Sequence, residues 1–175
     1  AKVGKGQRVL IYGASGAVGS AAVQLAKHLG AEVTGVCSTR NVELVRSLGA
    51  TEVLDYTKDD LSAHRDRFDV VFETVGKLPF KQCLELAKPN GVIITGSEMP
   101  GQMLKRAFSG KGDKQVTVIG GTAAESAEDM QYLAELWQQK EIRAVTDSTF
   151  PLERIAEAHV VAESGRKIGN VVVTI

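Results

Sequence analysis

Residues 8–19, with the sequence RVLIYGASGAVG, decide the fold of this chain. The apolar run at residues 9–12 predicts a buried strand, and residues 20–29 predict a helix. Three glycines lie between them, at Gly13, Gly16 and Gly19. A glycine-rich turn between a strand and a helix is the structural context of a dinucleotide-binding site.

Each glycine of this turn has a separate expected role. Gly13 allows a tight turn, Gly16 lets the backbone approach a pyrophosphate, and Gly19 lets the helix pack closely on the strand. The helix N-terminus adds unpaired N–H groups and a positive dipole end. Read strictly against G-x-G-x-x-G, Ala14 replaces the first glycine. The alternative is an ordinary strand-to-helix turn without a ligand.

The composition argues against several classes of function. With 175 residues, 43% hydrophobic and 24% charged, the chain is expected to form one globular domain with a full core. Lys plus Arg and Asp plus Glu both number 21, so no net charge favours nucleic acid or an acidic membrane. No apolar run approaches the ~20 residues of a membrane helix. Two cysteines, expected to be free thiols, indicate a cytoplasmic protein, and the cysteines and three histidines have no metal-ligand spacing.

Strand-like and helix-like segments alternate along the chain, which predicts an α/β fold. The predicted strands are residues 9–12, 32–36, 52–54, 69–72, 92–95 and 116–119, and the predicted helices are residues 20–29, 42–48, 78–87 and 127–139. Right-handed crossovers give a doubly wound parallel six-stranded Rossmann sheet of order 3-2-1-4-5-6, with helices on both faces. Residues 97–114 are expected to form a loop.

The ends of the chain suggest a domain excised from a longer two-domain protein. The first residue is not Met, and residues 170–175 form a strand-like apolar end. Residues 1–175 are therefore interpreted as one dinucleotide-binding domain. Residues 144–150 and 171–175 are expected to form two short strands that pair outside the main sheet.

The choice of nucleotide depends on the end of the second strand. An NAD site has an acid there, about 20 residues beyond the glycine motif. Residues 36–41, with the sequence VCSTRN, contain no acid, whereas Arg40 supplies charge and Ser38 a hydroxyl for a 2′-phosphate. This predicts NADP as the cofactor, although the same residues could simply cap the next helix. Tyr56 either lies along the adenosine or is an ordinary half-exposed tyrosine at a strand end.

Two further strand ends are expected beside the ligand, at residues 73–76 and 95–97. Glu73 is a carboxylate at the end of the fourth strand. Its expected role is to accept hydrogen bonds from backbone N–H groups of the following turn, with acid–base catalysis as the alternative.

These motifs resemble the cofactor-binding domain of the medium-chain dehydrogenase/reductase superfamily, in its quinone oxidoreductase-like, zinc-type alcohol dehydrogenase-like branch. The resemblance covers nearly the whole chain and rests on residues 6–19, 38–41, 48–56, 68–76 and 165–175. It implies NADPH-dependent reduction of quinones or activated carbonyl and enone compounds, usually by a dimer. The family positions that hold the dinucleotide correspond to Ser15, Gly16, Ala17, Val18, Ser38, Arg40, Tyr56, Val75 and Ser97.

The resemblance transfers no catalytic residue, because the family's substrate pocket and any catalytic zinc belong to another domain. The chain alone is therefore expected to be inactive. An alternative is an NADP-sensing regulator of the atypical short-chain reductase type. The catalytic Tyr-x-x-x-Lys pair of short-chain enzymes is absent, since Tyr12, Tyr56 and Tyr132 are followed at that spacing by other residues. A third alternative is an interaction module with a vestigial nucleotide site.

The sixth strand is expected to lie at an edge of the sheet with little defence against pairing. Lys114 alone protects the start of this strand against pairing, and no proline interrupts the strand. Two copies that pair these strands would form a homodimer with one continuous sheet. The alternative is that residues 97–114 fold over the edge and cover it.

Overall fold

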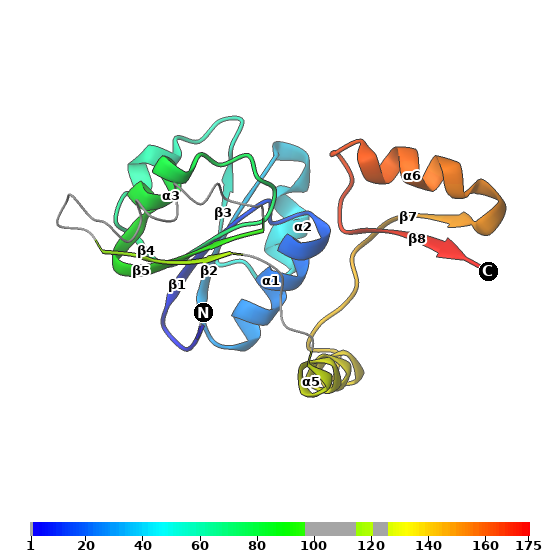
Figure 1. Ribbon diagram of the computed structural model, residues 1–175, viewed down its shortest axis with the longest axis horizontal. Helices are drawn as coiled ribbons and strands as arrows, with labels where there is room; N and C mark the ends of the chain where they lie inside the picture. Colours follow the sequence, from blue (N-terminus) through cyan, green and yellow to red (C-terminus); the bar gives the residue numbers. More distant parts are fainter. Residues whose placement is uncertain (1, 97–114, 121–125) are drawn as a thin grey trace.

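A parallel six-stranded sheet forms the centre of the protein (Figure 1). The computed structural model describes residues 2–96, 115–120 and 126–175. The strand order β3-β2-β1-β4-β5-β6 and the parallel pairing confirm the predicted Rossmann topology. In chain order the strands are β1 (Arg8–Tyr12), β2 (Glu32–Cys37), β3 (Glu52–Asp55), β4 (Phe68–Glu73), β5 (Ala87–Thr95) and β6 (Thr117–Gly120).

Helices cover both faces of this sheet because alternate strand residues are apolar on both sides. Val9 and Ile11 of β1 pack with α1 (Ala17–His28) and α2 (Val42–Ser47) on one face. Leu10 of the same strand packs with α3 (Phe80–Leu86) on the other. Helix α5 (Ala127–Gln138) lies below α1 in Figure 1, where His28 and Tyr132 are in edge-to-face contact.

Several predicted boundaries differ from the structure by one or two residues, and two predicted starts are wrong by three or more. Helix α1 begins at Ala17 and not at residue 20, since Gly16 is its N-cap and the residues after it are already helical. The three glycines predict a longer turn, but close packing of Gly19 on the backbone of Gly13 and Ala14 compensates for its low helix propensity. Strand β5 begins at Ala87 and not at residue 92. Its pairing with β4 has a register shift, which accommodates Asn90 with its φ of +63°.

The C-terminal residues form a separate two-stranded sheet, as predicted. Strand β7 (Thr146–Pro151) pairs with β8 (Asn170–Thr174) in parallel. Helix α6 (Ile155–Glu163), which the sequence analysis did not predict, connects them and makes this a β-α-β unit. In Figure 1 this unit stands beside the main sheet, next to α2.

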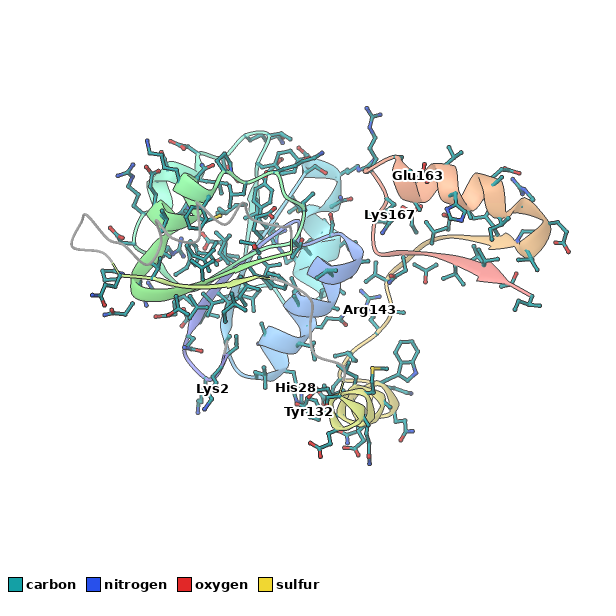
Figure 2. The ribbon with its side chains drawn as sticks, in the orientation of Figure 1. Lys2, His28, Tyr132, Arg143, Glu163 and Lys167 are labelled. Atoms are coloured by element: carbon teal, nitrogen blue, oxygen red, sulfur yellow. The ribbon has the colours of Figure 1, made fainter. Side chains whose placement is uncertain are left out.

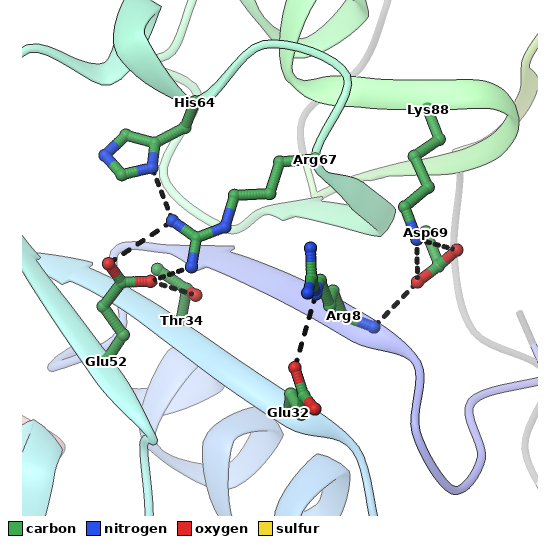
Figure 3. A network of polar contacts seen from close by, with 8 residues as sticks. All are labelled: Arg8, Glu32, Thr34, Glu52, His64, Arg67, Asp69 and Lys88. Carbon is green, nitrogen blue, oxygen red and sulfur yellow. Dashed lines mark hydrogen bonds and ion pairs between the residues drawn. The ribbon is translucent and has the colours of Figure 1, made fainter.

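Ion pairs connect the amino ends of the strands (Figure 3). Arg67 contacts Glu52 of β3 at 2.7 Å, and Lys88 of β5 contacts Asp69 of β4 at 2.8 Å. Asp69 also accepts the backbone N–H of Arg8, which begins β1. These pairs are partly exposed and add little stability individually. They occupy the end of the sheet opposite the carboxyl ends, where Rossmann folds bind ligands.

None of the helices in the described ranges has the length and apolar composition that crossing a bilayer requires.

Candidate functional site

A pocket of about 810 Å³ lies at the carboxyl ends of the central strands. It is open to solvent, and the structure brings nine of the eleven predicted site residues to its wall: Gly13, Ser15, Gly16, Ala17, Val18, Ser38, Arg40, Tyr56 and Val75. Gly19 lies behind the wall, buried in the first turn of α1. Ser97 lies outside the described residues.

The glycine turn has the geometry that close approach of a ligand requires. Gly13 has a φ of +83°, which only glycine adopts easily, and a Cβ there would lie 2.1 Å from Val75 Cγ2. Around Gly16, by contrast, a Cβ would meet only the Gly13 carbonyl oxygen, at 3.4 Å. The turn is therefore tight at Gly13 and open to the pocket at Gly16.

The N-terminus of α1 faces this opening without a side-chain partner. Gly16 is the N-cap of α1 and has no side chain, no side-chain cap bond to the helix is found among the described residues, and the first turn contains no acid. Its N–H groups therefore remain available to an anion, as at other phosphate-binding helix starts. Three large apolar side chains beside it are well exposed, with Val18 at 56%, Tyr56 at 52% and Val75 at 47%. A ligand in the pocket would cover them.

Residues 38–41, the segment after β2, line the pocket, and some of their polar side chains bond to other parts of the protein. Asn41 is buried and donates to Ser15 Oγ at 2.9 Å, which connects this segment to the glycine turn. The Thr39 hydroxyl donates to the Asp55 carboxylate. Neither Ser38 nor Asn41 makes a side-chain cap, so the capping alternative is not what this segment does.

Glu73 has the structural role expected for it. The side chain is buried, and its carboxylate accepts the backbone N–H groups of Val75, Gly76 and Lys77 at 2.6–3.2 Å. It therefore fixes the turn after β4 that carries Val75 to the pocket.

A second wall of the pocket comes from the segment between α6 and β8, which the sequence analysis missed. Gly169 donates its N–H to the Ser15 carbonyl at 2.8 Å, and the Arg40 guanidinium donates to the Arg166 carbonyl. Figure 2 shows Lys167 on this segment. The sequence signal was the basic pair Arg166-Lys167 between two glycines, but its place depends on the unpredicted helix α6.

The pocket is consequently cationic. Its lining includes Arg40, Lys77, Arg166 and Lys167, and no described residue of the lining is acidic. Such a wall favours a ligand that carries several negative charges.

Neither cysteine has the properties of a nucleophile or a metal ligand. Burial, with a smaller contribution from the charge of Asp55, raises the pKa of Cys37 to about 11. Burial likewise raises the pKa of Cys83 to about 12. Both thiols stay protonated at neutral pH.

Comparison with known proteins supplies the family. The family model for "Zinc-binding dehydrogenase" matches residues 48–173. The chain belongs to this family. The predicted resemblance to quinone oxidoreductase-like medium-chain dehydrogenases is confirmed, and the chain is an NAD(P)-binding domain of the oxidoreductase type.

Relatives at 30% identity and similar solved structures agree with this assignment. The chloroplast envelope quinone oxidoreductase homolog of Arabidopsis thaliana is 31% identical over 174 residues, covering 97% of this chain and 53% of the relative. The NADPH-dependent alkenal/one oxidoreductase of the same plant, also chloroplastic, is 30% identical over 172 residues, covering 96% and 40%. The structure of the quinone oxidoreductase from Coxiella burnetii superposes with a TM-score of 0.89 at 28% identity, covering 100% of this chain and 55% of that one. The chain thus spans about half the length of the curated relatives it matches, or less.

The described residues do not fit the zinc ion that the family's name implies. No group of three or more His, Cys, Asp or Glu side chains in the described ranges could hold a metal ion. They do fit a dinucleotide, because the pocket combines an open glycine turn, free helix N–H groups and four cationic side chains.

Proposed function

We propose that this domain binds NADPH in preference to NADH and serves an oxidoreductase that reduces quinones or activated carbonyl and enone compounds. The observation that carries the nucleotide preference is the cationic lining without an acid, with Arg40 and Ser38 at the position of the usual NAD-selecting carboxylate. The names of the quinone and alkenal/one oxidoreductase relatives support the substrate class.

The chain's own residues bind and orient the cofactor in this proposal. The N–H groups at the start of α1 hold the pyrophosphate, Arg40 and Ser38 hold the 2′-phosphate, and Tyr56 and Val75 cover apolar parts of the nucleotide. The bound dinucleotide supplies the hydride. One similar solved structure is an NAD-dependent alcohol dehydrogenase, with a TM-score of 0.85 and 27% identity over 99% of this chain and 52% of that one. The nucleotide preference therefore rests on this chain's residues and not on its relatives.

Arg40→Ala is expected to weaken NADPH binding by about 1.5–3 kcal/mol, the contribution of a hydrogen bond to a charged group. NADH affinity should change little, because NADH has no 2′-phosphate. Calorimetric titration of both nucleotides against the chain and the variant measures this difference.

Arg46→Ala is the matched control. Arg46 is an exposed arginine on α2 that pairs with Glu43 and does not line the pocket, so its removal should affect neither nucleotide. Equal affinities of the parent chain for NADPH and NADH would refute the proposed preference.

We propose further that two copies of the protein pair through β6. This strand is at the edge of the main sheet, and Ile119 on it is 38% exposed. Among the described residues no further strand pairs with this edge, and such an edge with an exposed isoleucine favours antiparallel pairing about a two-fold axis. Residues 97–114, the alternative cover, lie outside the described residues. The two buried free thiols fit a reducing compartment such as the cytoplasm, although the relatives include chloroplast proteins.

Ile119→Lys is expected to raise the dissociation constant of this dimer at least about tenfold, since a lysine on an edge strand opposes pairing. Light scattering over a concentration series measures the effect. Met130→Lys adds the same charge at an exposed apolar position on α5 and should leave the dimer intact. A parent chain that stays monomeric at high concentration would exclude β6 as the interface.

A further inference from the structure

We propose that Asp55 is a positioning residue for nucleotide specificity, because it fixes the loop that carries Ser38 and Arg40 against the loop that carries Tyr56. The proposal rests on the NADPH preference proposed above. It concerns a residue that does not itself line the pocket.

Asp55 lies where two loops leave the sheet side by side. It is the last residue of β3 and pairs in register with Cys37, the last residue of β2. Its side chain is buried, with a relative exposure of 6% for the whole residue. The β2 loop therefore begins directly beside this carboxylate.

The carboxylate joins the two loops through two threonines. One oxygen accepts the backbone N–H of Thr57 at 3.0 Å and its hydroxyl at 2.7 Å. The other accepts the Thr39 hydroxyl, and the two threonine hydroxyl oxygens lie 3.1 Å apart. The hydrogen bond from Thr39 is the main reason that the pKa of Asp55 falls to about 2, so the carboxylate is charged at neutral pH.

These contacts also explain why Asp55 does not act as an NAD-selecting acid. Each of its oxygens already accepts a hydrogen bond from the protein, and Lys58 Nζ lies 3.8 Å from the second one. With 6% of the residue exposed and no place in the pocket lining, the carboxylate offers little surface to a ribose diol. The negative charge is thus bonded within the protein and does not line the pocket.

The residues that would bind the nucleotide are chain neighbours of this network. Thr39 lies between Ser38 and Arg40, and Tyr56 lies between Asp55 and Thr57. The guanidinium of Arg40 is held separately by the Arg166 carbonyl. Arg40 therefore follows a residue whose side chain Asp55 holds, and its own guanidinium is held by the C-terminal segment. Such preorganisation favours binding.

Two variants test the proposal in the 175-residue chain. Asp55→Asn removes the charge with little change of shape, and Thr39→Val removes only the hydroxyl that joins the loops. Each is expected to lower NADPH affinity about fivefold or more, the equivalent of one hydrogen bond, with a change below about twofold for NADH. Calorimetric titration of both nucleotides gives the NADPH:NADH affinity ratio of each variant. Thr39→Ser should keep the ratio of the parent, because serine retains the hydroxyl.

Asp60→Asn is the matched control. Asp60 also accepts the backbone N–H and hydroxyl of a residue two positions on, Ser62, at 2.8 and 2.7 Å. It makes no described contact with the β2 loop. This variant should change neither affinity. In a second test, Asp55→Asn is combined with Arg40→Ala, and in that background it should lower the NADPH:NADH ratio much less than in the parent.

The outcomes separate this proposal from the one on which it rests. A parent chain that binds both nucleotides equally overturns both. A parent that prefers NADPH, with variants of unchanged ratio, overturns only the role of Asp55. An equal loss of both nucleotides in Thr39→Val would mean a purely structural contact and would also overturn it.

Discussion

Gly16→Val is expected to abolish nucleotide binding while the fold stays intact. Gly16 has φ −77° and ψ 178°, an extended conformation that any residue adopts. The added Cβ would lie 3.4 Å from the Gly13 carbonyl oxygen, which is an ordinary contact distance. The valine side chain would then occupy the pocket at the start of α1, where the pyrophosphate is expected to accept backbone N–H groups.

The expected loss follows from the hydrogen bonds that the phosphates can no longer reach. Two charge-assisted bonds of about 1.5–3 kcal/mol each correspond to a loss of about a hundredfold or more in affinity. Calorimetric titration with NADPH measures the loss, and circular dichroism and thermal melting report whether the fold is intact. Normal binding by the variant would show that the glycine turn has no part in nucleotide recognition.

Gly4→Val is the control for this substitution. Gly4 has no atom within 4 Å of an added Cβ and does not line the pocket. The same side chain at this position should therefore leave both binding and melting unchanged.

The sequence was sufficient to predict the main sheet, because its information is local and periodic. Each central strand is a short apolar run bounded by turn residues, and the right-handed crossover rule then leaves one common strand order. The start of α1 was misplaced because Gly16 and Gly19 both resemble turn residues in sequence. In the structure Gly19 is helical, and its close approach to Gly13 explains why a glycine stands at this position.

The candidate site was predicted in part for a related reason. The glycine turn and the β2 loop follow predictable strands, so their residues could be placed at one edge of the sheet. Arg166 and Lys167 reach the same pocket through a β-bridge between Gly16 and Gly169, residues more than 150 positions apart. No local pattern encodes that pairing.

Asp55 illustrates a second limit of sequence reasoning. An acid after a strand could equally bind a ribose, hold a metal or accept protein hydrogen bonds. In the structure the carboxylate accepts hydrogen bonds from Thr39 and Thr57 and does not line the pocket, and it belongs to no group in the described ranges that could hold a metal ion.

Gly19→Ala is expected to destabilise the domain by about 1–3 kcal/mol or more, the usual cost of overpacking. In an open helix the same change would add about 1 kcal/mol of stability, because alanine has the higher helix propensity. Here the added Cβ would lie 2.1 Å from the Gly13 carbonyl oxygen and 2.8 Å from the Ala14 Cα. Both are backbone atoms of the glycine turn, so α1 would have to move away from that turn.

The sign of the effect is therefore the test. Urea denaturation should give a lower midpoint for Gly19→Ala than for the parent. Ala21→Gly, at an exposed position two residues further along α1, measures the helix-propensity cost in the same helix and should lower stability by about 1 kcal/mol. A Gly19→Ala variant as stable as the parent would mean that α1 does not need this close approach to the glycine turn. The fold could then tolerate a side chain at the position where the family pattern has its third glycine.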